Sequence, residues 1–104
     1  MDTAEPSSID ALILAAQRQY ADSLPAKVAD LHAHVAGGAW EEARRAAHKL
    51  RGSASTYGFA ALGAAAGAIE EALLLDASPG DEARARIAAH LVEARAEAER
   101  AAAR

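Results

Sequence analysis

Alanine restricts the fold of this chain more than any other residue, since it occupies 32 of the 104 positions. It has the highest helix propensity of the amino acids, and its small side chain lets helices pack closely. Only 22 residues are larger apolar ones, and the β-branched and aromatic residues that strands favour are scarce. The sequence therefore predicts an all-α protein built as a helical bundle.

Length and charge narrow the possible functions further. A chain of 104 residues fits one small domain and leaves no room for a separate catalytic or nucleotide-binding domain. The net charge of -4 argues against a general electrostatic attraction to nucleic acid. There is no cysteine, no apolar run of about 18 residues and no basic leader in the acidic start MDTAEPSSID. We therefore expect a cytoplasmic, monomeric protein with a single domain over residues 1–104.

Turn signals divide the chain into predicted helices. Ser7 begins a stretch that resembles a capping box, and Pro25 is expected to break or bend the chain, because proline is unfavourable inside a helix. Gly37-Gly38 and the later Gly58 are typical of helix ends. The predicted helices cover about residues 7–22, 25–36, 39–56 and 59–76, with a last one from residue 81 towards the C-terminus.

Apolar residues recur at helical spacing in each of these segments. In residues 7–22 the predicted inward stripe consists of Ile9, Leu12, Ile13, Ala16 and Tyr20. The later inward faces are predicted at Val28, Leu31 and Val35; at Trp40, Ala43, Ala47, Leu50 and Ala54; at Leu62, Ala65, Ala66, Ile69 and Leu73; and at Ile87, Leu91 and Ala94. The tail 96–104 lacks large apolar residues and is expected to fray, as are residues 1–7. The predicted core therefore spans about residues 8–95.

A histidine stands on the outer face of the predicted helix 39–56. At about 100° per residue, His48 points roughly 130° away from the centre of the apolar stripe. The same outer side carries Arg44, Arg51, Gly52 and Ser55, whereas Lys49 lies further round the helix. The sequence thus predicts an exposed histidine in basic surroundings.

Gly52 lies one turn after this histidine, where a glycine is unfavourable. Glycine inside a helix costs about 1 kcal/mol relative to alanine, and this sequence uses alanine freely elsewhere. One explanation is steric, since a side chain at position 52 would obstruct a partner that approaches His48. A close helix crossing and simple tolerance of glycine are the alternatives that the helix pattern leaves open.

The stretch AHKLRGSASTYGF, residues 47–59, resembles the signature of histidine-containing phosphotransfer (HPt) domains. In that signature a histidine is followed by x-[LI]-[KR]-G-[SA]-[SA], and a further glycine starts the next helix. The likeness extends from about residue 20 to residue 75 and includes Leu24-Pro25, Gly37-Gly38 and the spacing of Ile69 and Glu70. The resemblance implies an up-and-down four-helix bundle with an additional N-terminal helix.

The resemblance implies a role for three residues in phosphoryl transfer. His48 would be the phosphoacceptor, and Arg51 would balance the phosphoryl charge at a position where most relatives have lysine. Glu70 lies where many relatives have glutamine. We expect its carboxylate to accept the N–H of the His48 ring, which would leave Nε2 free to attack.

Five further residues around the histidine are candidates for phosphate or partner binding. Gly52 matches the small position that lets the partner approach, and Ser53 matches a small residue packed beside it. Lys49 is a second candidate for balancing charge, and Ser55 lies on the outer side of the same helix. Arg44 either contacts an acidic partner surface or keeps the helix soluble.

The chemistry expected from the resemblance requires another protein. The chain has no glycine-rich phosphate loop, no Walker-type lysine motif and no apparent magnesium cluster, so we do not expect it to use ATP or a cofactor itself. The implied donor is an aspartyl phosphate on the receiver domain of a hybrid histidine kinase, with Mg²⁺ supplied by the receiver. The implied acceptor is the receiver domain of a response regulator. An HPt-like module that only sequesters a receiver and a helical assembly protein remain as alternatives.

The other histidines do not predict a metal site. His32 and His34 are two residues apart, so they point to different faces of a helix, and no third ligand accompanies them. His90 stands alone in the last predicted helix. We interpret all three as surface or partly packed residues.

Overall fold

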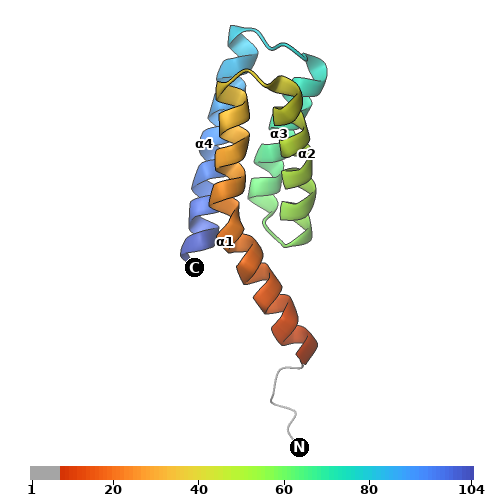
Figure 1. Ribbon diagram of the computed structural model, residues 1–104, viewed down its shortest axis with the longest axis vertical. Coiled ribbons are helices and arrows are strands. Elements are labelled where there is room, and N and C mark those ends of the chain that lie inside the picture. The colour runs from red at the N-terminus through yellow and green to blue at the C-terminus, as the bar shows by residue number, and fades with distance from the viewer. Residues whose placement is uncertain (1–7) are drawn as a thin grey trace, which may run out of the picture.

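The structure is a computed structural model, and over the residues that it describes, 8–104, it contains four α-helices and no strand (Figure 1). The helices are α1 (Ser8–Ala36), α2 (Trp40–Thr56), α3 (Ala60–Leu75) and α4 (Asp81–Ala103). Helix α1 packs against α2 and α4, and α3 packs against the same two helices. The predicted all-α four-helix bundle is therefore confirmed. The predictions for Ser7 and for fraying of residues 1–7 lie outside the described residues.

Glycine turns end the first two helices. Gly38 follows α1 with a φ of +70°, and Gly58 follows α2 with a φ of +88°. Residues with a side chain rarely adopt this left-handed conformation, so both turns favour glycine. After Gly58, the N–H of Phe59 donates to the Ala54 carbonyl at 2.8 Å, which caps the end of α2. The predicted helix ends at these two turns are confirmed.

The core lies between the faces that the sequence pattern predicted for α2, α3 and α4. The buried residues from those predicted faces are Ala43, Ala47, Leu50, Ala54, Leu62, Ala65, Ala66, Ile69, Leu73, Ile87, Leu91 and Ala94. Trp40 is only half-buried, and the Arg84 guanidinium lies over its ring at 5.3 Å from the centroid. Alanine is the most frequent residue in the core, and its small side chain allows the helices to approach closely.

The sequence predicted a break or a bend at Pro25, and of these two the break is wrong, because α1 continues through this residue. Proline has no N–H to donate to the Ala21 carbonyl one turn earlier, which makes the helix interior unfavourable for it. Packing compensates for this loss, since Leu24 and Val28 are buried beside the proline while Pro25 itself is exposed. The additional N-terminal helix expected from the resemblance is therefore the first part of α1 rather than a separate element (Figure 1).

The first two turns of α1 extend beyond the bundle, which corrects a second expectation. Ile9, Leu12 and Ile13 were predicted to face inward, but all three are exposed. Gln17 donates a hydrogen bond to the Tyr57 carbonyl after the end of α2, at 3.2 Å. The helical residues 8–15 are all exposed, because this part of α1 extends past the end of α2 (Figure 1).

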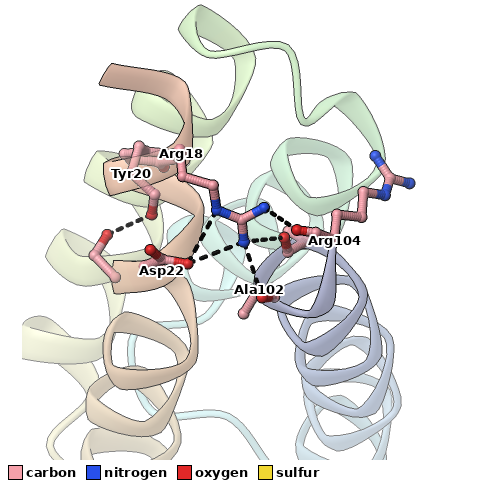
Figure 2. A network of polar contacts seen from close by, with 7 residues as sticks. Arg18, Tyr20, Asp22, Ala102 and Arg104 are labelled. Atoms are coloured by element: carbon pink, nitrogen blue, oxygen red, sulfur yellow. Dashed lines mark hydrogen bonds and ion pairs between the residues drawn. The ribbon is translucent and has the colours of Figure 1, made fainter. Parts of the chain in front are cut away.

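The predicted fraying of the tail 96–104 is also wrong, because α4 is helical to Ala103 and buries Ala98 and Ala101. Figure 2 shows Arg18 of α1 reaching the C-terminal end of α4. Its guanidinium donates to the carbonyls of Ala101, Ala102 and Arg104, at 3.3 Å and 2.9 Å for the first two. A cation that bonds the last carbonyls of a helix also interacts favourably with the helix dipole.

Replacing Arg18 with methionine should destabilise the bundle by about 1 kcal/mol, because the carbonyls of α4 lose their donor while the apolar stem is retained. The measurement is thermal unfolding followed by circular dichroism, and the expected fall is roughly 5 °C for a domain of this size. Arg86→Met is the matched control, since Arg86 pairs only with the exposed Glu82 on its own helix. Equal effects of the two substitutions would contradict the capping role of Arg18.

Candidate functional site

His48 lies near the middle of α2, on the edge that faces α3. Its neighbours Ala47 and Leu50 are buried in the core, whereas the side chain of His48 is 67% exposed. This orientation follows from the helical periodicity, because the apolar residues of α2 fix which side of the helix faces inward. The predicted exposure of His48 is confirmed.

Glu70 of α3 holds one nitrogen of the exposed ring. The Nδ1 atom of His48 lies 2.7 Å from Oε2 of Glu70, whose side chain is only 6% exposed. An ionised carboxylate can only accept hydrogen bonds, so the proton of this bond belongs to Nδ1. In the neutral ring Nε2 then carries the lone pair, which makes it the nucleophilic nitrogen. The contact predicted between Glu70 and His48 is present.

The second oxygen of the same carboxylate binds Arg51, one turn after the histidine. Nη1 of Arg51 donates to Oε1 of Glu70 at 3.1 Å. Burial by itself raises the pKa of the Glu70 carboxyl, but hydrogen bonds from Arg51 and His48 and their positive charge outweigh burial and lower the pKa. Glu70 is therefore ionised near neutral pH.

Two glycines of α3, neither of them predicted to belong to the site, lie opposite this edge of α2. A Cβ added to Gly67 would lie 3.3 Å from Cδ of Arg51, and one added to Gly63 would lie 2.8 Å from Oγ of Ser55. Both glycines are buried between the helices. The signal was available, since two glycines four residues apart interrupt a run of alanines and mark one helix face.

Gly52 lies on the open side of the site. Apart from its chain neighbours and the backbone of its own helix, no atom lies within 4 Å of the position that its Cβ would occupy, so this glycine serves no helix crossing within the bundle. The carbonyl of Gly52 accepts a hydrogen bond from Oγ1 of Thr56 at 3.0 Å, so this backbone group has a partner within α2. Of the three explanations for this glycine, clearance for a partner and simple tolerance remain.

Three of the predicted site residues have other contacts. Arg44 pairs with Glu41 at 2.7 Å; the hydrogen bond and the charge of Glu41 raise the pKa of Arg44, with a smaller effect of the Glu70 charge. The Ser55 hydroxyl donates back to the Arg51 carbonyl at 2.9 Å. Lys49 lines a surface groove between α1 and α2 instead of the edge that carries Glu70. These residues surround the histidine without contacting its ring.

Ser53 connects α2 with α1. Its hydroxyl lies 2.6 Å from the hydroxyl of Tyr20, whose ring stacks on Tyr57 with 4.4 Å between centroids. Burial raises the pKa of Tyr20 above its ordinary value. Ser53 therefore packs on the inner side of α2, as expected of a small residue beside Gly52.

Within the part of the chain that the structure describes, no three His, Cys, Asp or Glu side chains gather in a way that could hold a metal ion. His32 lines a groove between α1 and α4, whereas His34 lines the groove between α1 and α2. Nδ1 of His90 lies 2.8 Å from Glu93 on the same helix. Each of these histidines lies away from the edge formed by His48, Arg51 and Glu70.

Comparison with known families explains this arrangement. The family model described as the Hpt domain matches residues 16–103, so the protein belongs to the Hpt domain family. Hpt domains serve in histidine phosphotransfer in phosphorelays and interact with receiver domains of response regulators or kinases. No match was found among curated proteins or among solved structures. Among the helices of residues 8–104, none combines the length and apolar character that a membrane span requires.

Replacing Glu70 with glutamine should lower the stability at pH 7 by about 1 kcal/mol, because the amide has no charge and only one accepting oxygen, whereas His48 and Arg51 bind different oxygens of the carboxylate. The folded-state pKa of Glu70 is lowered, so its stabilising effect is present above the unfolded pKa of about 4.3 and disappears as the pH falls through the folded value. Unfolding temperatures of both proteins at pH 7, 5 and 3 test this prediction. The difference should shrink at pH 3, and a difference that does not change with pH would contradict it.

Proposed function

We propose that His48 is the phosphoacceptor of a phosphorelay, which takes a phosphoryl group from an aspartate of one receiver domain and passes it to an aspartate of a second. The observation that carries this proposal is the contact between the ionised Glu70 and Nδ1 of His48. Because the proton is held on Nδ1, the lone pair of Nε2 is directed at the solvent side from which a partner arrives. The exposed ring on a rigid helix is suited to successive partners.

In the proposed reaction a bond forms between Nε2 and phosphorus while the bond from phosphorus to the aspartate oxygen breaks. The aspartate leaves as a carboxylate, and the ring keeps its Nδ1 proton and gains positive charge. Ionised Glu70 balances that charge without moving. Because no proton has to leave the site, the same contacts serve transfer in both directions.

Positive charge on the edge that carries His48 comes from Arg51, whose guanidinium is bonded to Glu70. Such a fixed cation favours the oxygens of the phosphoryl group. Mg²⁺ and the acidic residues that bind it belong to the receiver domain in this proposal, so the chain needs no cofactor and no ATP site. Gly52 leaves open space next to the histidine for the receiver surface.

The cytoplasmic location and the monomeric state expected from the sequence belong to the same proposal. A receiver must reach Nε2, so the face of α2 that carries His48 has to remain open. The alternative of a module that only sequesters a receiver differs in one observable respect, since it predicts receiver binding without labelling of His48.

His48→Gln should remove all phosphoryl labelling and leave the helical circular dichroism unchanged, because the ring is exposed. The measurement is incubation with phosphorylated receiver domains from the same genome, followed by detection of the labelled chain. The label should be lost in acid and retained in base, as expected of phosphohistidine. His90→Gln is the control and should label normally, and labelling that survives in His48→Gln would assign the phosphoacceptor to another residue.

Gly52→Ala should maintain the stability or raise it by up to about 1 kcal/mol, because the added methyl group meets no atom and alanine favours the helix. Gly52→Gln should fold as well but slow transfer from the receiver, because the larger side chain occupies the space beside His48. Thermal unfolding and the transfer rate are measured for both variants. Transfer by Gly52→Gln at the wild-type rate would show that this glycine is merely tolerated.

A further inference from the structure

Gly67 is an unexpected residue at its position in α3. It follows Ala64, Ala65 and Ala66, in a helix where alanine would be the more favourable choice. The φ of Gly67 is not among the positive values, so the backbone itself does not require glycine there. An explanation must come from what surrounds the residue.

The side chain of Arg51 lies so close to Gly67 that a Cβ at position 67 would force it to shift by a few tenths of an ångström. A Cβ on Gly67 would lie 3.3 Å from Cδ, 3.5 Å from Nε and 3.7 Å from Cγ of Arg51. The arginine thus lies flat against the backbone of α3 on its way to Glu70, three residues further along that helix. The Nη1 atom meets Oε1 of Glu70 at 3.1 Å at the end of this path.

Displacing Arg51 would not require the bundle to rearrange. The atoms closest to the added Cβ belong to a flexible side chain that is 52% exposed and can turn into solvent. At Gly63 the situation differs, since an added Cβ would meet the Arg51 carbonyl of the backbone at 3.3 Å in addition to the Ser55 hydroxyl. The two glycines therefore serve different purposes, one for helix packing and one for the position of Arg51.

We propose that Gly67 is a positioning residue for phosphoryl transfer, which leaves the space through which Arg51 reaches Glu70 beside His48. Gly67 touches neither the ring nor the phosphoryl group and acts only through the arginine. The inference rests on the proposed function for its effect on transfer. The dependence of the Arg51–Glu70 ion pair on Gly67 is a purely structural claim, and it does not require the proposed function to be correct.

The test compares Gly67→Ala with Arg51→Ala and with the double variant. Three quantities are measured: the unfolding temperature, the rate of transfer from a phosphorylated receiver to His48, and the acid titration of the Glu70 carboxyl carbon by NMR. Ala64→Gly is the control, because it changes helix propensity at an exposed position of α3.

Gly67→Ala should keep or raise the unfolding temperature while transfer slows about tenfold, the size expected for the loss of one charge-assisted hydrogen bond. The Glu70 titration should move to higher pH, because Arg51 no longer favours the ionised form. Arg51→Ala should move it in the same direction, and the double variant should show no further change in rate or titration. Ala64→Gly should lower the unfolding temperature and leave the other two quantities unchanged.

An unchanged Glu70 titration in Gly67→Ala would overturn the inference, as would effects of the two substitutions that add in the double variant. A loss of stability in Gly67→Ala that Arg51→Ala does not relieve would also overturn it, since the glycine would then be needed for helix packing. The titration requires no phosphoryl donor. A wild-type chain that accepts no phosphate therefore rejects the proposed function and leaves this test of Gly67 intact.

Discussion

The buried carboxylate of Glu70 is the constraint on which the site depends. A charge in the interior of a bundle is unfavourable unless it is paired and hydrogen-bonded, and Glu70 is only 5% exposed. Both of its oxygens are satisfied from α2, one by His48 and one by Arg51. Because the two donors lie three residues apart on one helix, a single carboxylate can bind both only if α2 and α3 keep one register.

That register explains why the helices are built from small residues at this contact. Gly63 faces Ser55 and Gly67 faces Arg51, so at two successive turns α3 contributes no side chain to the contact and the side chains of Ser55 and Arg51 lie directly against it. Alanine at the buried positions of α2, including Ala43, Ala47 and Ala54, extends the same close approach into the core. The composition that predicted a helical bundle thus also provides the short distance over which Glu70 reaches the histidine.

Periodicity within one helix could be predicted from the sequence, and contacts between helices could not. The inward faces of α2, α3 and α4 and the outward direction of His48 follow from residue spacing alone, and the structure confirms them. Three expectations failed because tertiary contacts decide them. The burial of Leu24 and Val28 stabilises α1 across Pro25, and Arg18 stabilises the C-terminal end of α4. Ile13 is exposed because the N-terminal part of α1 extends beyond the other helices. The close contact between Gly67 and Arg51 was missed for the same reason, since a helical wheel describes one helix without its neighbour.

The choice of arginine at position 51 has a consequence for the charge balance of the site. One guanidinium nitrogen of Arg51 is bound to Glu70, and that bond supports the ionised state of the carboxyl, which keeps the proton on Nδ1 of His48. A phosphoryl group on Nε2 would attract the same cation. Guanidinium carries five N–H donors in one plane, so it can bind a phosphoryl oxygen through a second nitrogen while Nη1 stays on Glu70. An ammonium group would have to satisfy both anions from one nitrogen. If His48 carries phosphate as proposed, arginine would let the free and the phosphorylated histidine share one arrangement of Glu70, provided that α3 leaves room for the planar group.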